Sequence, residues 1–73
     1  MKIHVLLPVG TVTPREHEAI VASLTAYYFA HLGALGVDRI ARGLSRQEEK
    51  MLMDETKRFG EASFSGSKVS FES

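Results

Sequence analysis

Residues 14–35, PREHEAIVASLTAYYFAHLGAL, decide the fold, because they carry one continuous helical pattern of about six turns at 3.6 residues per turn. Large apolar and aromatic side chains share one broad face of this helix, and small residues share the opposite face. The large residues are Ile20, Val21, Leu24, Tyr27, Tyr28, Leu32 and Leu35. The small residues are Ala19, Ala22, Ala26, Ala30 and Gly33. A helix that is apolar all round must be covered all round, so the pattern predicts a cover made by a second element, a second copy of the chain or lipid.

Both ends of this long helix carry sequence signals. Thr13 is the predicted N-cap, Pro14 occupies the first helical position, and Glu16 completes a capping box in which side chains and backbone N–H groups bond reciprocally. The helix is predicted to end at Gly36, because glycine readily takes the left-handed conformation that follows many helices. Gly33 is the alternative, earlier end.

A second helix is predicted over residues 46–59. Ser45 and Glu48 repeat the capping-box spacing at its start, and Gly60 is expected to end it. A brief helical turn over residues 38–42 precedes it. The second helix has a narrow apolar stripe among many charges, so we expect it to cover one side of the long helix.

Two short strands are predicted near the ends of the sequence. Residues 2–7, KIHVLL, alternate between two faces up to Pro8, which stops the strand. Near the other end, Val69 and Phe71 keep the same alternation. The alternative for residues 62–73 is a flexible polar tail, because this segment is rich in serine.

The predicted fold is a single small α+β domain over residues 1–73 with the order strand, long helix, short turn, helix, strand (βααβ). An isolated pair of strands is marginal in water, and a chain of this size with no cysteine lacks disulfide staples. Both points favour a homodimer in which helices and strands pair across the axis. The predicted dimer interface is the small face, formed by Ala19, Ala22, Ala26, Ala30 and Gly33.

Composition and charge argue against several classes of function. Without cysteine the chain has no disulfide, no thiolate metal site and no thiol nucleophile. Nine Lys and Arg residues balance nine Asp and Glu residues, so no global field attracts nucleic acid or an acidic membrane.

Residues 1–7 are too short for a secretory signal, which favours the cytoplasm. The uncharged residues 19–37 approach the length of a membrane span, but two tyrosines at mid-span and mixed charges at both ends favour a buried helix over a membrane segment.

The residues that could carry chemistry do not form a recognisable catalytic or metal site. The three histidines, His4, His17 and His31, lack the spacing of a metal-ligand pair, and no serine or threonine stands in a nucleophile motif. The carboxylates at residues 48–55 are interleaved with basic residues at positions 46, 50, 57 and 58, as on a solvated helix. We therefore expect no catalytic residue, no cofactor and no metal, and we expect that the protein is not an enzyme.

Basic residues give the sharper signal for binding. If residues 38–59 formed one nearly continuous helix, five basic residues would fall within one quarter of its circumference: Arg39, Arg42, Arg46, Lys50 and Lys57. Such a stripe could dock on an acidic protein surface or follow a phosphate backbone. The competing interpretation is a solvated face, because Gly43 and Ser45 break the helix and neighbouring acids cancel much of the field.

By exclusion, the sequence favours a small protein–protein interaction module, an adaptor or inhibitor that binds and modulates a larger protein. The expected contacts are Arg39, Arg42, Arg46 and Lys50, because arginine is enriched among binding hot spots. Such compactness is common among proteins encoded by phages and mobile elements, which suggests that origin. The alternative is a dimeric nucleic-acid-binding transcriptional regulator that uses the same basic stripe.

Overall fold

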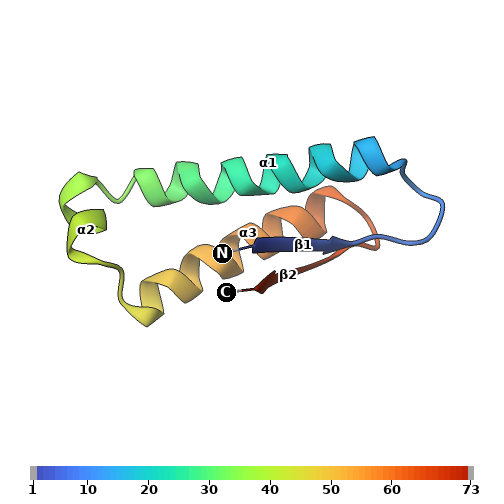
Figure 1. The fold of residues 1–73 in the computed structure, drawn as a ribbon. Helices are drawn as coiled ribbons and strands as arrows, with labels where there is room; N and C mark the ends of the chain where they lie inside the picture. Colours follow the sequence, from blue (N-terminus) through green and yellow to red (C-terminus); the bar gives the residue numbers. More distant parts are fainter. Residues whose placement is uncertain (1, 73) are drawn as a thin grey trace.

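The computed structural model describes residues 2–72 and contains two strands and three helices. In chain order they are β1 (Lys2–Leu6), α1 (Pro14–Gly33), α2 (Val37–Arg42), α3 (Arg46–Ser63) and β2 (Lys68–Glu72). This is the small α+β arrangement that the sequence predicts. The chain is elongated, 43 × 20 × 19 Å, with α1 and α3 along its length and α2 joining them at one end (Figure 1).

Both predicted capping boxes are formed. The Thr13 hydroxyl accepts a hydrogen bond from the N–H of Glu16 at 3.2 Å, and the Glu16 carboxylate accepts one from the N–H of Thr13 at 3.0 Å. Ser45 and Glu48 repeat this pair at the start of α3, with distances of 3.1 and 3.0 Å. The helix starts are local features of the backbone, so the sequence alone was sufficient to place them.

The helix ends differ from the main predictions. Helix α1 ends at Gly33, the earlier of the two predicted ends. Helix α3 does not end at Gly60 but continues to Ser63. The prediction for Gly60 was wrong because this glycine has a packing role: a Cβ placed there would lie 2.8 Å from Val69 Cγ2 and 2.9 Å from Leu24 Cδ1. Its hydrogen atom lets α3 approach both β2 and α1 closely.

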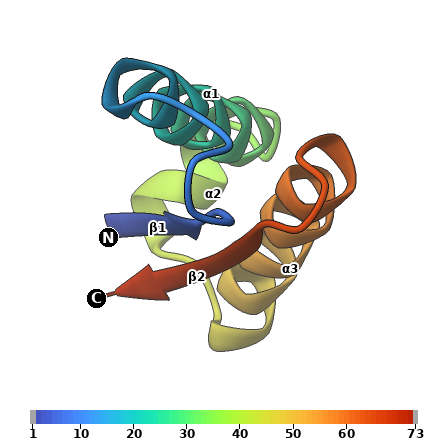
Figure 2. The same ribbon diagram turned by 90° about the vertical axis from the view of Figure 1, so that its right-hand side faces the viewer.

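The two strands pair in antiparallel orientation, with Val5 opposite Val69 and Ile3 opposite Phe71. Ile3, Val5 and Val69 are buried on the face that meets the helices, and the other face of the sheet is exposed. Viewed along the helices, α1, α3 and the sheet form three sides of a triangle around the core (Figure 2). The alternation predicted for both strands is therefore confirmed.

Helix α1 is covered on one side within a single chain. Ile20, Leu24 and Tyr28, spaced four residues apart, join Leu52 of α3 and the three strand residues in the buried core. All five residues of the predicted small face are exposed: Ala19, Ala22, Ala26, Ala30 and Gly33. The sequence predicts that α1 is covered all round, but within one chain the other elements cover it on one side only.

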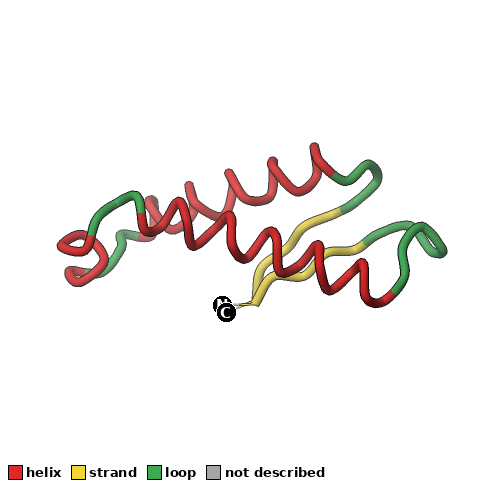
Figure 3. Tube along the Cα trace, turned by 90° about the horizontal axis from the view of Figure 1, so that it is seen from above, coloured by secondary structure: helices red, strands yellow, loops and turns green. Residues whose placement is uncertain are grey.

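The sheet accompanies only part of the helix pair. Seen from above, the strands lie beside the half of α1 and α3 that is remote from α2 (Figure 3). The half near α2 is a layer of two crossing helices with no strand on it. Within residues 2–72, no helix combines the length and apolar character that a membrane span requires.

Candidate binding surface

The predicted basic stripe is divided in two. Gly43, with φ of 87°, separates α2 from α3, so residues 38–59 are not one helix. Arg39 lies beside the first turn of α3, where its Nε donates to Glu48 Oε2 at 2.7 Å. Arg42, Arg46 and Lys50 are exposed near this junction. The structure thus keeps the four predicted cations at one end of the molecule but assigns Arg39 an intramolecular partner.

Glu48 holds α2 and α3 together electrostatically. The N–H of Ser45 and, secondly, the Arg39 side chain both bond to its carboxylate and hold the pKa of Glu48 below its ordinary value. At neutral pH the group is therefore ionised, and the Arg39–Glu48 ion pair links the two helices across Gly43. The link joins the side chain of an α2 residue to the first turn of α3.

Large exposed apolar residues gather at the same end. Eight large hydrophobic side chains are exposed in the described residues, and five of them lie between residues 29 and 51: Phe29, Leu35, Val37, Ile40 and Met51. Val37 is 82% exposed, Met51 57% and Ile40 42%. None of the six residues of α2 is buried. Leu35 and Met51 line a common pocket. We call the five residues the exposed apolar cluster, because large apolar residues exposed at one end of a molecule mark an interaction surface more often than scattered ones do.

Sequence reasoning missed this apolar cluster. A usable signal was present in α2, where Val37, Ile40 and Ala41 follow the spacing i, i+3, i+4 of an amphipathic helix. Helix α2 has only six residues, so its apolar spacing is a weaker sequence signal than the arginines in the same segment. The exposure of Val37 and Ile40 depends on where α2 lies in the fold, which local spacing does not specify.

A pocket of 460 Å³ opens between the last turns of α1 and the first half of α3. It is lined by His31, Leu35, Glu48, Met51, Leu52 and Glu55. Three of these residues are apolar, two are carboxylates, and no lysine or arginine lines the pocket. Its chemistry is therefore apolar with an acidic margin.

Aromatic residues continue the surface away from α2. The rings of Tyr27 and Phe59 stack with centroids 4.2 Å apart, and His31 stacks on Tyr27 at 4.1 Å. Tyr27 and His31 are four residues apart and share one face of α1, and Leu35 follows in the turn after the helix. His31 and Leu35 both line the pocket. The aromatic stack fixes the contact between α1 and α3.

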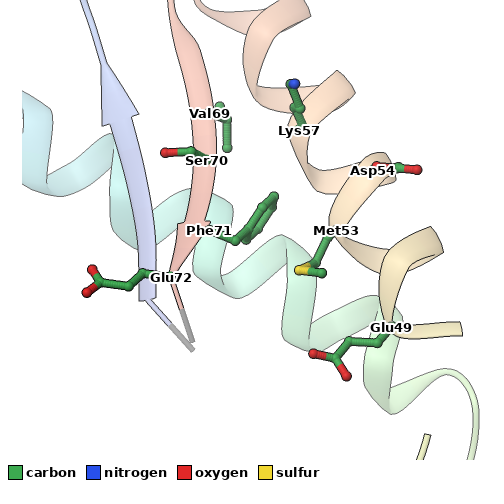
Figure 4. Close-up of a pocket in the computed structure, with 8 residues that line it drawn as sticks. All are labelled: Glu49, Met53, Asp54, Lys57, Val69, Ser70, Phe71 and Glu72. Carbon is green, nitrogen blue, oxygen red and sulfur yellow. The ribbon is translucent and has the colours of Figure 1, made fainter. Parts of the chain in front are cut away.

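A second pocket, of 610 Å³, lies between β2 and α3. Met53 of α3 and Phe71 of β2 point toward each other in it, and charged side chains such as Glu49 and Lys57 surround them (Figure 4). Met53 and Met51 lie on different faces of α3, because two residues correspond to about 200° of rotation. Both Met53 and Phe71 are half-buried.

Side chains from the helices cap both outer edges of the sheet. His17 Nε2 of α1 lies 2.7 Å from the carbonyl oxygen of Val5, and Glu61 of α3 accepts a hydrogen bond from the N–H of Val69 at 2.9 Å. Val5 and Val69 face each other in the sheet. The caps occupy peptide groups that strand pairing with another chain would need.

The histidines have separate partners. His4 Nε2 lies 2.6 Å from Glu72 Oε2, and His31 Nδ1 lies 2.9 Å from the carbonyl oxygen of Tyr27, while His17 contacts Val5. Among residues 2–72, no three His, Asp or Glu side chains are grouped in a way that could hold a metal ion. The predictions of no catalytic residue and no cofactor remain predictions.

Comparisons with models of protein families, with curated proteins and with solved structures find no match to this chain. The chemistry of its own surface is therefore the basis for assigning a function. On that basis the α2 end is the candidate site, because it combines exposed apolar residues, a pocket and the predicted cations.

Proposed function

We propose that this protein is a small interaction module that binds and modulates a larger protein, as adaptors and inhibitors do. The observation that supports the proposal is the exposed apolar cluster at the α2 end. Leu35, Ile40 and Met51 are left in water there although the chain has a formed core. Burying such side chains against a partner is worth about 25 cal/mol per Å² of apolar surface.

The cations beside the cluster support the same proposal. Arg42, Arg46 and Lys50 are exposed and lie close to the apolar residues in the sequence and at the same end of the molecule. Arginine beside apolar anchors is a common composition for the energetic centre of an interface. Arg39 is expected to act indirectly, because its side chain already bonds to Glu48.

The experiment is capture of the partner by the purified tagged chain from a lysate of the source organism, with and without nuclease. We expect one protein to be retained after nuclease treatment. Ile40→Asp should abolish its retention, because a carboxylate would be desolvated at the interface. Val9→Asp is the matched control, because Val9 is an exposed apolar residue outside the cluster.

Retention that survives Ile40→Asp, or no retained protein at all, would overturn the proposed function. Recovery that vanishes with nuclease would instead support the alternative, a nucleic-acid-binding regulator. In that case the double variant Arg42→Glu with Arg46→Glu should abolish binding and reduce its dependence on salt.

A further inference from the structure

We propose that the pocket between α1 and α3 binds a basic amphipathic helix of the partner. The inference rests on the proposed function and deepens it by naming the chemistry of the partner segment. It is carried by the lining of the pocket, its place between two helices and the sign of its charges.

The lining of the pocket suits aliphatic side chains. Leu35, Met51 and Leu52 contribute the apolar surface, and Met51 is more than half exposed. Methionine is unbranched and polarisable, so it adapts to partner side chains of different shapes. A volume of 460 Å³ gives room for a few leucine-sized side chains.

The position of the pocket suits a helix. Its lining comes from the last turn of α1, the turn after it and α3, toward the α2 end of the helix pair. Figure 3 shows that the strands lie beside the other half of the pair. A groove between two packed helices accepts the apolar face of a third, which presents residues at i, i+3, i+4 and i+7. An extended strand would lack a free sheet edge here, because the sheet is remote and its edges are capped at Val5 and Val69.

The charges of the pocket select a basic partner. Glu48 and Glu55 are its only charged lining residues. Glu48 already bonds to Arg39, whereas the described residues include no ion pair to Glu55. A lysine or arginine beside the apolar face of a bound helix would pair with Glu55, and a carboxylate at that position would be repelled. Arg42, Arg46 and Lys50 lie outside the lining of the pocket and remain free to contact other parts of the same partner.

The test uses the whole chain labelled with ¹³C at its methionine methyl groups and observed by NMR. The chain has three methionines, so Met51 reports on the pocket and Met53, on another face of α3, is an internal control. Variants Met51→Leu and Met53→Leu assign the two signals. The probes are two helical peptides of about 14 residues that share leucines at i, i+3, i+4 and i+7 and carry either lysine or glutamate elsewhere.

We expect the lysine peptide to shift the Met51 signal saturably while Met53 stays unchanged. The glutamate peptide should have no effect at concentrations up to about 1 mM. Glu55→Lys should raise the Kd of the lysine peptide by about fivefold or more. Glu49→Lys, the same charge change beside Met53, is the matched control and should leave that Kd unchanged.

Three results would overturn the inference: no shift of Met51 with the lysine peptide, equal binding of both peptides, or equal shifts of Met51 and Met53. A shift of Met51 that depends on protein concentration and not on peptide would assign the pocket to a second copy of the chain and would also overturn it. Because the peptides are defined, these results are independent of the capture experiment. If the pocket does not bind the lysine peptide, the capture experiment with Ile40→Asp still tests the proposed function.

Discussion

Gly60 sets the distance between α3 and the rest of the core. It lies inside α3, and its Cα hydrogen faces the side chains of Leu24 and Val69. The hydroxyl of Ser67, in the turn between α3 and β2, donates to the Gly60 carbonyl oxygen at 3.3 Å. One residue therefore determines how closely a helix, a turn and a strand approach.

We predict that Gly60→Ala destabilises the protein. The new Cβ would lie 2.8 Å from Val69 Cγ2 and 2.9 Å from Leu24 Cδ1, and neither buried side chain can move away easily. Overpacking of this kind costs about 1–3 kcal/mol, which outweighs the gain of about 1 kcal/mol in helix propensity. Gly33→Ala is the control, because a Cβ there meets nothing within 4 Å. Urea unfolding should show a loss for the first variant only; equal stability of the two would contradict the packing argument.

The two capping boxes are expected to make the free energy of unfolding depend on pH. Backbone N–H groups at Thr13 and Ser45 hold the pKa of Glu16 and Glu48 below the ordinary value of 4.5. A carboxyl whose pKa is lowered by folding stabilises the folded state above its unfolded pKa, and this contribution is lost as pH falls from 4.5 through the lowered pKa.

We therefore expect the free energy of unfolding to decrease as the pH is lowered below 4.5. The double variant Glu16→Gln with Glu48→Gln should be less stable at neutral pH and should show a smaller decrease. Glu18→Gln, outside both capping boxes, is the control. Urea unfolding at a series of pH values measures the effect, and an unchanged pH slope in the double variant would rule out these two residues as its source.

At the scale of elements, the sheet depends on the helices beside it. Two paired strands alone are marginal in water, and here each strand has a helix packed on it. His17 from α1 and Glu61 from α3 also bond to the outward peptide groups of Val5 and Val69. These bonds stabilise the sheet at its edges, where pairing with a further strand would otherwise be needed.

Removal of the Glu61 carboxylate should expose the edge of β2. In Glu61→Ala the Val69 N–H loses its acceptor, so its amide hydrogen exchange should be faster by about tenfold. Glu61→Gln keeps an acceptor oxygen and should restore most of the protection. Exchange measured by NMR at Val69, with Leu24 in the core as reference, tests this; unchanged exchange in Glu61→Ala would show that the bond does not protect the edge.

At the scale of the whole molecule, apolar surface is unevenly covered. The half of the helix pair beside the sheet contains the strand residues of the core, and the half near α2 carries most of the exposed large apolar residues. The small face of α1, from Ala19 to Gly33, is exposed along the same helix. The sequence predicts a homodimer with helices and strands paired across the axis, and the exposed small face is where its helices would meet.

We predict that Ala26→Glu abolishes association and leaves the chain folded. Ala26 lies on the exposed small face, so the carboxylate is tolerated in one chain but would be desolvated between two. Sedimentation equilibrium of the wild type should show a dimer, and circular dichroism of the variant should show an unchanged helical content. Lys57→Glu, an exposed change outside this face, is the control. A monomeric wild type, or a dimeric variant, would refute the small face as the interface.

The sequence alone was sufficient for features that depend on neighbouring residues. The capping boxes at Thr13 and Ser45, the alternation of both strands and the apolar face of α1 follow from hydrogen bonds and side-chain directions within a few residues. All are confirmed except at Leu35, which lies beyond the end of α1 and is 40% exposed. The order of elements followed from them. The single helical stripe predicted for Arg39, Arg42, Arg46 and Lys50 was wrong, because Gly43 separates α2 from α3, and the binding role of these residues remains a prediction.

Only the tertiary structure decided what depends on distant residues. Gly60 was predicted as a helix stop because its neighbours in sequence allow one, but Val69 and Leu24, from other elements, require a glycine there. The pocket and the exposure of Ile40 and Met51 depend on how the three helices pack, and Met51 lies on a face of α3 other than the one on which Met53 meets β2. Such features are set by the lengths and crossing of whole elements, and no spacing within one segment specifies them.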